Sequence, residues 1–175
     1  TLADGEPVFT PGEANGLSVG IVGSGPAGLS CAAYLSRLGY AVTVYERRAA
    51  PGGLDTYGMA EYKMTRAASL AEAELIGKMG VKFVTETRVV ADGSETATGT
   101  VTAGSLRSQY DAVVIAAGLG ATNHLNIPGE YLAGVIDALT FIESIKTRDW
   151  RSVPLGRRVA VIGAGNTAID AATQA

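Results

Sequence analysis

Two glycine-rich stretches carry the residues whose types and spacing could do chemistry. The first, GSGPAG over 23–28, has the spacing G-x-G-x-x-G. In such a loop the first glycine permits a tight turn, the second lets backbone approach a diphosphate, and the third allows a helix to pack closely on a strand. The free N–H groups and the positive end of the helix dipole then face the phosphate charge. The loop therefore predicts a site for the diphosphate of a dinucleotide.

Such a loop must lie between a strand and a helix. The run LSVGIVG over 17–23 is apolar, β-branched and bounded by glycine, which is typical of a buried parallel strand. Helical spacing begins at Pro26, a residue suited to the first helical position, and ends near Gly39. AVTVYE over 41–46 predicts the next strand, and its last residue, Glu46, can accept hydrogen bonds from ribose hydroxyls. We prefer dinucleotide binding to the alternative that the three glycines serve only the tight packing of the helix on the strand.

The second stretch, VAVIGAGNTAID, repeats the pattern near the end of the chain. We expect a strand over 159–163 and a helix from Asn166 onward, in a natural chain that continues further. Gly163 lies 140 positions after Gly23, close to a domain length, so it should open a second unit. The division we expect is a lead-in over 1–16, a first nucleotide-binding unit over 17–155 and the start of a second nucleotide-binding unit over 156–175.

The pattern between the two loops predicts an α/β fold. It is a parallel, Rossmann-like sheet with helices on both faces and a small antiparallel meander, followed by the start of a second nucleotide-binding domain. The elements expected are a loop over 47–65, a helix with a capping box at Ser69 and Glu72 that Gly80 closes, a strand over 81–90, the meander over 92–110, a strand over 111–118 and a helix over 138–146.

Composition limits the function classes. Apolar residues make up 47% and charged residues 18% of 175, the profile of a soluble globular protein. The net charge of −3, without a long basic run, speaks against nucleic acid and anionic membrane surfaces as partners. The apolar runs are too short to span a bilayer, and no signal-peptide pattern is visible, so a cytoplasmic location is the default. One cysteine rules out an internal disulfide or a cysteine-rich metal site within these residues.

Spacing alone does not choose FAD over NAD, but a second group of residues does. Gly52 and Gly53 lie in a loop that returns toward the same crevice, and VVIAAGLG over 113–120 ends another strand on small residues. Small side chains at the carboxyl end of a strand let a ligand lie against the sheet edge. The alternative explanation is that these small residues serve close packing alone, without a ligand.

Four stretches together resemble the flavin domain of the glutamate synthase small-subunit-like oxidoreductases, a group that includes the flavin segment of dihydropyrimidine dehydrogenase. They lie in that family's order, at 23–64, 110–118, 125–142 and 159–172. The FAD residues that the resemblance implies are Gly23, Gly25, Pro26, Ala27 and Gly28 at the diphosphate, Glu46 and Arg47 at the ribose, Gly53 and Leu54 near the flavin, Lys63 nearby, Val89 at the adenine, and Ala116, Ala117 and Gly118 closing over the cofactor. The nicotinamide-nucleotide loop would begin with Gly163, Gly165, Asn166 and Thr167, with Ala168 in place of the third glycine.

The resemblance implies electron transfer. NAD(P)H would reduce FAD by hydride transfer, and FAD would pass single electrons to iron–sulfur clusters. Those clusters would belong to a missing domain or a partner subunit, with a larger catalytic subunit as a further partner, and the NAD(P)H site is incomplete in these residues. We nominate no catalytic acid or base and no metal ligand, because the isoalloxazine ring carries the chemistry.

Three alternatives stay open at this point. A flavin monooxygenase or amine oxidase shares the first loop but would lack the second, and a plain NAD-dependent dehydrogenase would lack the Pro-Gly-Gly loop. A truncated flavin-fold domain could act as a non-catalytic binding module. The residue that separates NAD from NADP lies beyond Ala175.

Several conspicuous residues have plain explanations. Cys31 is expected to be a packing thiol, and His124 to lie on a loop without a catalytic or metal-binding role. Asp170 follows the second loop, where solvation or capping is as plausible as ligand contact. The charged stretch 146–151 is expected to be a solvated linker, and the polar loop residues around 57–63 could tune a flavin electrostatically.

Overall fold

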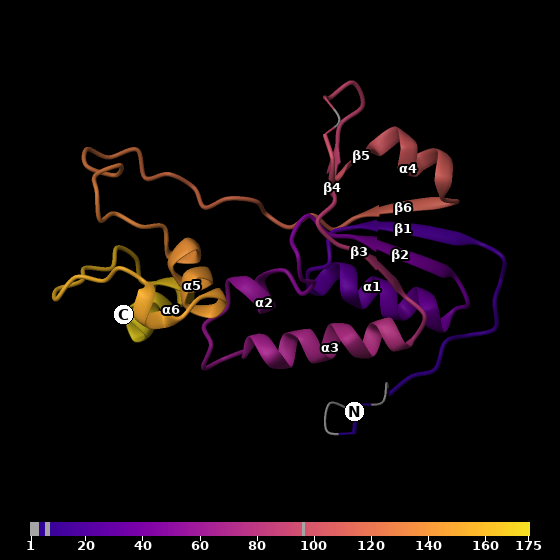
Figure 1. Ribbon diagram of the computed structural model, residues 1–175, viewed down its shortest axis with the longest axis horizontal. Coiled ribbons are helices and arrows are strands. Elements are labelled where there is room, and N and C mark those ends of the chain that lie inside the picture. The colour runs from indigo at the N-terminus through magenta and orange to yellow at the C-terminus, as the bar shows by residue number, and fades with distance from the viewer. Residues whose placement is uncertain (1–3, 6–7, 96) are drawn as a thin grey trace.

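A parallel four-stranded sheet forms the centre of the protein. The computed structural model describes residues 4–5, 8–95 and 97–175. The strand order is β3-β2-β1-β6, with α1 and α3 on one face and α4 on the other (Figure 1). This is the predicted α/β architecture. The elements are β1 Ser18–Val22, α1 Pro26–Arg37, β2 Ala41–Tyr45, α2 Leu54–Tyr57, α3 Arg66–Lys78, β3 Lys82–Val84, β4 Arg88–Val90, β5 Thr100–Thr102, α4 Ala103–Gln109, β6 Ala112–Ile115, α5 Ala138–Thr147, the 3-10 helix η1 Trp150–Ser152 and α6 Asn166–Gln174.

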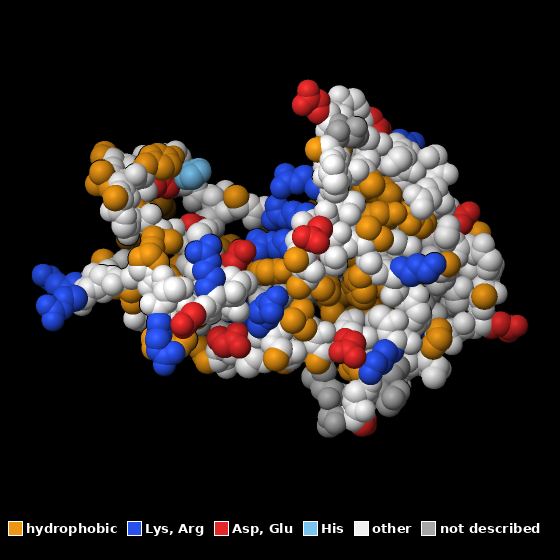
Figure 2. All heavy atoms as spheres, viewed as in Figure 1, with side chains coloured by type: hydrophobic (Ala, Val, Ile, Leu, Met, Phe, Trp, Pro, Cys, Tyr) orange, Lys and Arg blue, Asp and Glu red, His pale blue; other side chains and the backbone are white. Residues whose placement is uncertain are grey.

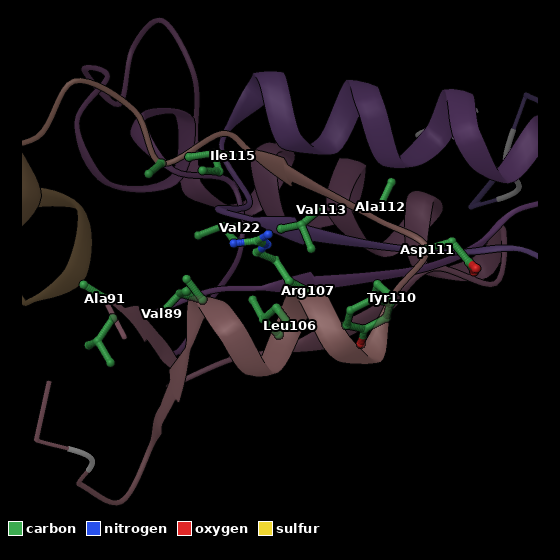
Figure 3. A pocket seen from close by; sticks show the side chains of 13 residues that line it. Val22, Val89, Ala91, Leu106, Arg107, Tyr110, Asp111, Ala112, Val113 and Ile115 are labelled. Carbon is green, nitrogen blue, oxygen red and sulfur yellow. The ribbon is translucent and has the colours of Figure 1, made fainter. Parts of the chain in front are cut away.

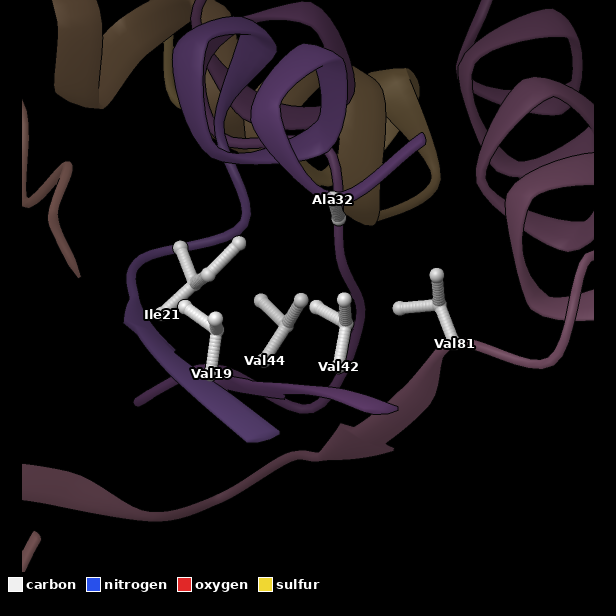
Figure 4. Close-up of a cluster of buried hydrophobic side chains, with 6 residues drawn as sticks. All are labelled: Val19, Ile21, Ala32, Val42, Val44 and Val81. Carbon is white, nitrogen blue, oxygen red and sulfur yellow. The ribbon is translucent and has the colours of Figure 1, made fainter. Parts of the chain in front are cut away.

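The main core lies between the sheet and α1. Alternate side chains of β1 and β2 point toward Ala32 of α1 (Figure 4). In register, Val19 pairs with Val42 and Ile21 with Val44, so their branched side chains form one apolar layer. The side chains of Ile21 and Val44 are both fully buried. Burial of this layer supplies the hydrophobic free energy that fixes the helix on the sheet.

The opposite face of the sheet is covered by α4 and the residue that follows it. Leu106 is buried there, and the ring of Tyr110 lies on Gly20, where a Cβ atom would come within 2.7 Å of the ring. The hydroxyl groups of Tyr110 and Tyr45 are 2.9 Å apart. The sheet is therefore sandwiched at the strands that carry the first glycine loop.

The predicted antiparallel meander over 92–110 is wrong. β4 and β5 pair in parallel, Val89 opposite Val101, and the chain then enters α4 instead of a further strand. The helix starts here because Thr102 caps it, its hydroxyl accepting from the amide of Ser105. Residue 96, within the predicted meander, lies outside the described residues. A threonine- and glycine-rich composition indicates turns, but it does not distinguish a strand from a capped helix.

Two predicted boundaries also change. The strand expected over 81–90 is broken between β3 and β4, where Glu86 has φ of 53° and leaves the extended conformation. The capping box at Ser69 and Glu72 is absent, since α3 begins one turn earlier with Thr65 as its cap. The hydroxyl of Ser69 is instead buried against Thr56, at 2.7 Å. The predicted position of Gly39 after the first helix is confirmed, with φ of 84°.

The C-terminal helices form a second, smaller cluster beside the sheet (Figure 1). Phe141 and Ile142 of α5 pack against Ala171 of α6. The predicted strand over 159–163 is not formed, because among the described residues no strand pairs with it, and its valines and Ile162 are exposed. Figure 2 shows further apolar side chains near the single pale blue histidine, on the long segment that leads to α5.

The prediction that 146–151 is a solvated linker is wrong for its first residue. The side chain of Lys146 is completely buried, and its ammonium donates to the carbonyls of Asp55, Met59 and Met64 at 2.8, 2.9 and 2.6 Å. Glu61 lies 3.6 Å away. Burial lowers the pKa of the Lys146 ammonium, and the Glu61 carboxylate opposes that shift. An ammonium has three donors, so three carbonyls satisfy it and fasten α5 to the segment over 54–64.

None of the helices in the described part of the chain has the length and apolar character needed to cross a membrane.

The Lys146→Met variant should lose about 2–4 kcal/mol of unfolding free energy, because the three carbonyls lose their donor in a buried site. Urea unfolding followed by circular dichroism measures this loss. Lys82→Met, at an exposed position of β3, is the control and should change the free energy by about 0.5 kcal/mol or less. Equal stability of the two variants would contradict the assigned role.

The tyrosine pair predicts a loss of stability at alkaline pH. Burial, and then the hydrogen bond to Tyr110, raises the pKa of Tyr45 from 10.0 to about 12. The folded state then holds this proton more tightly, so its contribution is complete below pH 10 and disappears as the pH rises toward 12. Tyr45→Phe should flatten the dependence of unfolding free energy on pH across that window. An unchanged slope would show that this pair is not responsible.

Candidate functional site

The first glycine loop connects β1 to α1 through two close backbone contacts. Gly23 has φ of 101°, and a Cβ atom there would overlap the carbonyl oxygen of Ala116 after β6. A Cβ atom on Gly28 would overlap the carbonyl oxygen of Gly23. These positions therefore require glycine for the turn and for the approach of α1 to the sheet, the roles predicted for the first and third glycines.

Gly25, the middle glycine, has no such packing role. It is the N-cap of α1 with φ of −70° and ψ of −179°, a conformation open to any residue, and the nearest atom to a Cβ there is the Cα of Gly53, 3.9 Å away. No side chain caps the helix. The free amides of its first turn therefore have no side-chain acceptor, which is the arrangement that accepts a phosphate.

Capping divides the helices of the described residues into two groups. The N-terminal amides of α3, α4 and α5 each donate a hydrogen bond to a capping side chain, that of Thr65, Thr102 and Asp137, respectively. In contrast, α1, α2 and α6 begin at glycines without a side-chain cap. Those glycines are Gly25, Gly53 and Gly165, all predicted cofactor residues. Gly25 and Gly165 lie in the two predicted phosphate loops, where a bound ligand would supply the missing acceptor.

The Pro-Gly-Gly loop lies against the first glycine loop, as predicted. The amide of Gly52 donates to the carbonyl of Ser24 at 2.9 Å, and a Cβ atom on Gly53 would lie 2.6 Å from the Cα of Gly25. Leu54, which begins α2, is exposed beside it. Two loops that are separate in sequence thus lie directly against each other.

Glu46 is buried behind the first loop, immediately after β2. Its carboxylate accepts from the hydroxyl of Ser24 at 2.6 Å and from the amides of Ser24 and Arg48 at 3.1 and 2.9 Å. A carboxylate can accept about four hydrogen bonds, so these three leave capacity for one more. The neighbouring Arg47 is exposed. The Glu46 carboxylate, which is predicted to bind the ribose, therefore also holds the first glycine loop in place.

A cavity of about 590 Å³ joins Val89 to the end of β6. Its lining is mainly apolar and includes Val22, Ile115 and Ala117, with the Arg107 side chain reaching in from α4 (Figure 3). Val89, predicted to contact the adenine, and Ala117, predicted to close over the cofactor, thus line the same cavity beside the first loop.

The second set of predicted residues lies apart from this cluster. Gly163, with φ of 132°, precedes α6, whose N-cap is Gly165 with φ of −79° and ψ of 173°. A Cβ atom on Gly165 would meet nothing within 4 Å. Asn166 and Thr167 form the first turn of the helix and are exposed. The start of α6 therefore reproduces the geometry of the start of α1.

Lys63 forms an ion pair with Asp170 of α6, 2.5 Å away, and the hydroxyl of Tyr62 donates to the same carboxylate at 2.7 Å. The lysine and the tyrosine together hold the pKa of Asp170 below its usual range, and the aspartate raises the pKa of Lys63. Of the alternatives left open for Asp170, solvation is excluded, because its side chain is buried.

Sequence reasoning missed the roles of three polar residues of the site. Ser24 could have been noticed as the one hydroxyl inside the first loop. Lys146 and Asp170 were noticed, but their partners could not be predicted, since these lie more than 80 residues away in the sequence. Among the described residues there is no group of three or more His, Cys, Asp or Glu side chains that could hold a metal ion.

The fold and the paired glycine loops define a nucleotide-binding α/β oxidoreductase. The chain belongs to the pyridine nucleotide-disulphide oxidoreductase family, whose model matches residues 17–175. The family supports the predicted cofactors, FAD and NAD(P)H. Cys31 is the single cysteine of the sequence and lies half-buried in α1, so these residues contain no cysteine pair for a redox disulfide.

Curated relatives confirm the resemblance to the glutamate synthase small-subunit group. A putative glutamate synthase [NADPH] small chain of Cereibacter sphaeroides is 36% identical over 97% of this chain and 40% of its own length. The NADP(+)-dependent formate dehydrogenase subunit beta of Moorella thermoacetica is 37% identical over 92% of this chain and 22% of its own length. The chain thus spans less than half of these relatives.

Among solved structures, the chain is similar to FprA of Mycobacterium tuberculosis in complex with NADPH. The identity is 31% and the TM-score 0.68, covering 89% of this chain and 35% of FprA. This likeness in three dimensions agrees with the family assignment.

The first loop predicts opposite outcomes for two alanine variants. Gly28→Ala should destabilise the protein by about 3 kcal/mol, because the new methyl overlaps backbone that cannot move aside. Gly25→Ala should preserve stability or raise it by up to about 1 kcal/mol, since its conformation suits alanine. Thermal unfolding of the two variants measures the difference, and equal losses would contradict the separate roles given to these glycines.

Proposed function

We propose that the chain is part of a flavin-dependent NAD(P)H oxidoreductase that passes electrons to iron–sulfur clusters or to a partner subunit. The first unit would bind FAD and the start of the second would bind the nicotinamide nucleotide. The domain boundaries proposed are those of the sequence, 17–155 and 156–175.

One observation carries this proposal, the twin geometry of two helix starts. Gly25 and Gly165 are both N-caps in extended conformation, both lack a side-chain cap, and both have space where a side chain would stand. Two such starts support two separate phosphate-bearing ligands in one protein. A flavin enzyme reduced by a nicotinamide nucleotide requires two such ligands.

The residues at the first loop fit FAD in particular. The amides of Gly25, Ala27 and Gly28 would hold its diphosphate, Glu46 its ribose and the cavity at Val89 its adenine. Gly53 would border the flavin half, and Ala117 would close over the cofactor. When bound, FAD accepts a hydride from NAD(P)H with a proton from water, leaving NAD(P)⁺, and releases its two electrons one at a time. The protein's part is to hold and orient the cofactor and to exclude water.

The names of relatives support the destination of the electrons. They include a small chain of glutamate synthase and a beta subunit of formate dehydrogenase, both parts of larger assemblies by name. We infer that this chain also serves a larger catalytic subunit, with iron–sulfur clusters in that partner or in another domain.

Substitution of each N-cap glycine tests the assignment of ligand to loop. In the protein that contains this chain, Gly25→Ala should lower the affinity for FAD at least about tenfold, because the methyl occupies the path of the diphosphate. Gly165→Ala should keep FAD and weaken NAD(P)H binding by a similar factor. FAD content comes from the visible spectrum, and NAD(P)H affinity from a fluorescence titration.

Gly77→Ala is the matched control, because this α3 glycine can take a methyl at ordinary contact distance, 3.7 Å from Phe83. It should change neither affinity. Equal effects of Gly25→Ala and Gly165→Ala on both ligands, or no effect of either, would refute the proposal.

A further inference from the structure

The buried carboxylate of Asp170 meets the only polar side chains that link α6 to the segment after α2 in the described residues. The ammonium of Lys63 and the hydroxyl of Tyr62 both contact its Oδ1 atom, at 2.5 and 2.7 Å. Two donors on one oxygen fix the position of that oxygen more narrowly than a single contact would. The contact is long-range, since Tyr62 and Asp170 are 108 residues apart.

This contact joins the two halves of the proposed site. Tyr62 and Lys63 follow α2, whose N-cap Gly53 packs on Gly25 of the first glycine loop. Asp170 lies five residues after Gly165, on the first turns of the helix that the second loop opens. The first and second glycine loops are therefore connected through the polar contacts of Tyr62 and Lys63 with Asp170.

The apolar contacts of α6 are few by comparison. Ala171 is the one buried apolar residue of α6 in them; it packs against Phe141 and Ile142 of α5, with the partly buried Ala138, Ile145 and Val153 around this cluster. Apolar contacts are non-directional, so a small cluster permits sliding and rotation of a helix, whereas hydrogen bonds to a buried carboxylate do not. The orientation of α6 thus depends on Asp170.

We propose that Asp170 is a positioning residue, which sets the nicotinamide-nucleotide loop relative to the flavin loop through Tyr62 and Lys63. This inference rests on the proposed function. Hydride transfer needs the reacting atoms about 3–3.5 Å apart, and a displacement of about 1 Å can cost a hundredfold in rate. Asp170 touches neither cofactor in this role. Its loss should therefore slow reduction of the flavin while each ligand still binds.

Asp170→Asn in the full-length protein provides the test, because asparagine keeps the shape and removes the charge. The FAD content and the dissociation constant for NAD(P)H should stay within about twofold, while the rate of flavin reduction at saturating NAD(P)H falls at least about tenfold in stopped flow. Tyr62→Phe, which removes one of the two donors, should give an intermediate rate. Glu72→Gln, an exposed carboxylate of α3, is the control and should match the wild type.

A second readout needs no cofactor. Amide hydrogen exchange at 168–172 in the ligand-free protein should quicken at least about tenfold in Asp170→Asn, with α1 unchanged. An unchanged exchange rate together with an unchanged reduction rate would overturn the inference. Weaker NAD(P)H binding with a normal rate at saturation would also overturn it, because Asp170 would then be a ligand contact.

The failure of the proposed function is distinguishable from these results. In that case the wild-type protein itself would show no FAD or no reduction by NAD(P)H, and the positioning role would fall with it. Faster exchange in Asp170→Asn would then show a structural bridge alone.

Discussion

The structure depends on the close approach of three backbone segments at the carboxyl edge of the sheet. α1 lies directly on the turn at Gly23, that turn lies on the chain leaving β6 at Ala116, and the loop at Gly53 lies on Gly25. Side chains at Gly23 or Gly28 would force these segments apart. Since Gly23, Gly25, Gly53 and Ala116, all predicted FAD residues, meet at this junction, its geometry decides whether a cofactor site exists.

Around that apolar and backbone junction, charged side chains hold the flanking segments. Lys146 fastens α5 to the segment over 54–64, and an Arg48–Glu143 ion pair connects α5 to the segment between β2 and α2. The guanidinium of Arg48 also stacks on Tyr57, 4.3 Å from the ring centre. Polar contacts of this kind are directional, so they orient the helices more than they contribute net stability. The arrangement suits a protein that must hold two ligands at a fixed separation.

The sequence was sufficient to predict the parallel sheet, both glycine loops and their helices, because those features depend on local periodicity and on glycine's backbone freedom. Gly23 and Gly28 could be assigned their roles before the structure was known. The partners of Lys146 and Asp170 could not, since a side chain's environment in a fold depends on segments far away in the chain. The strand over 159–163 failed for a related reason: a strand forms only with a pairing partner, and periodicity does not supply one. The meander over 92–110 was predicted wrongly for a different reason. Thr102 caps a helix there, and a threonine- and glycine-rich composition does not reveal such a cap.

The visible absorption spectrum of the purified chain tests the central claim most directly. We expect flavin bands, and we expect denaturation to release the pigment as FAD, because the junction at Gly23, Gly25 and Gly53 and the acid at Glu46 all lie within these residues. A colourless protein that stays colourless after incubation with FAD would contradict the claim that this edge of the sheet forms a flavin site.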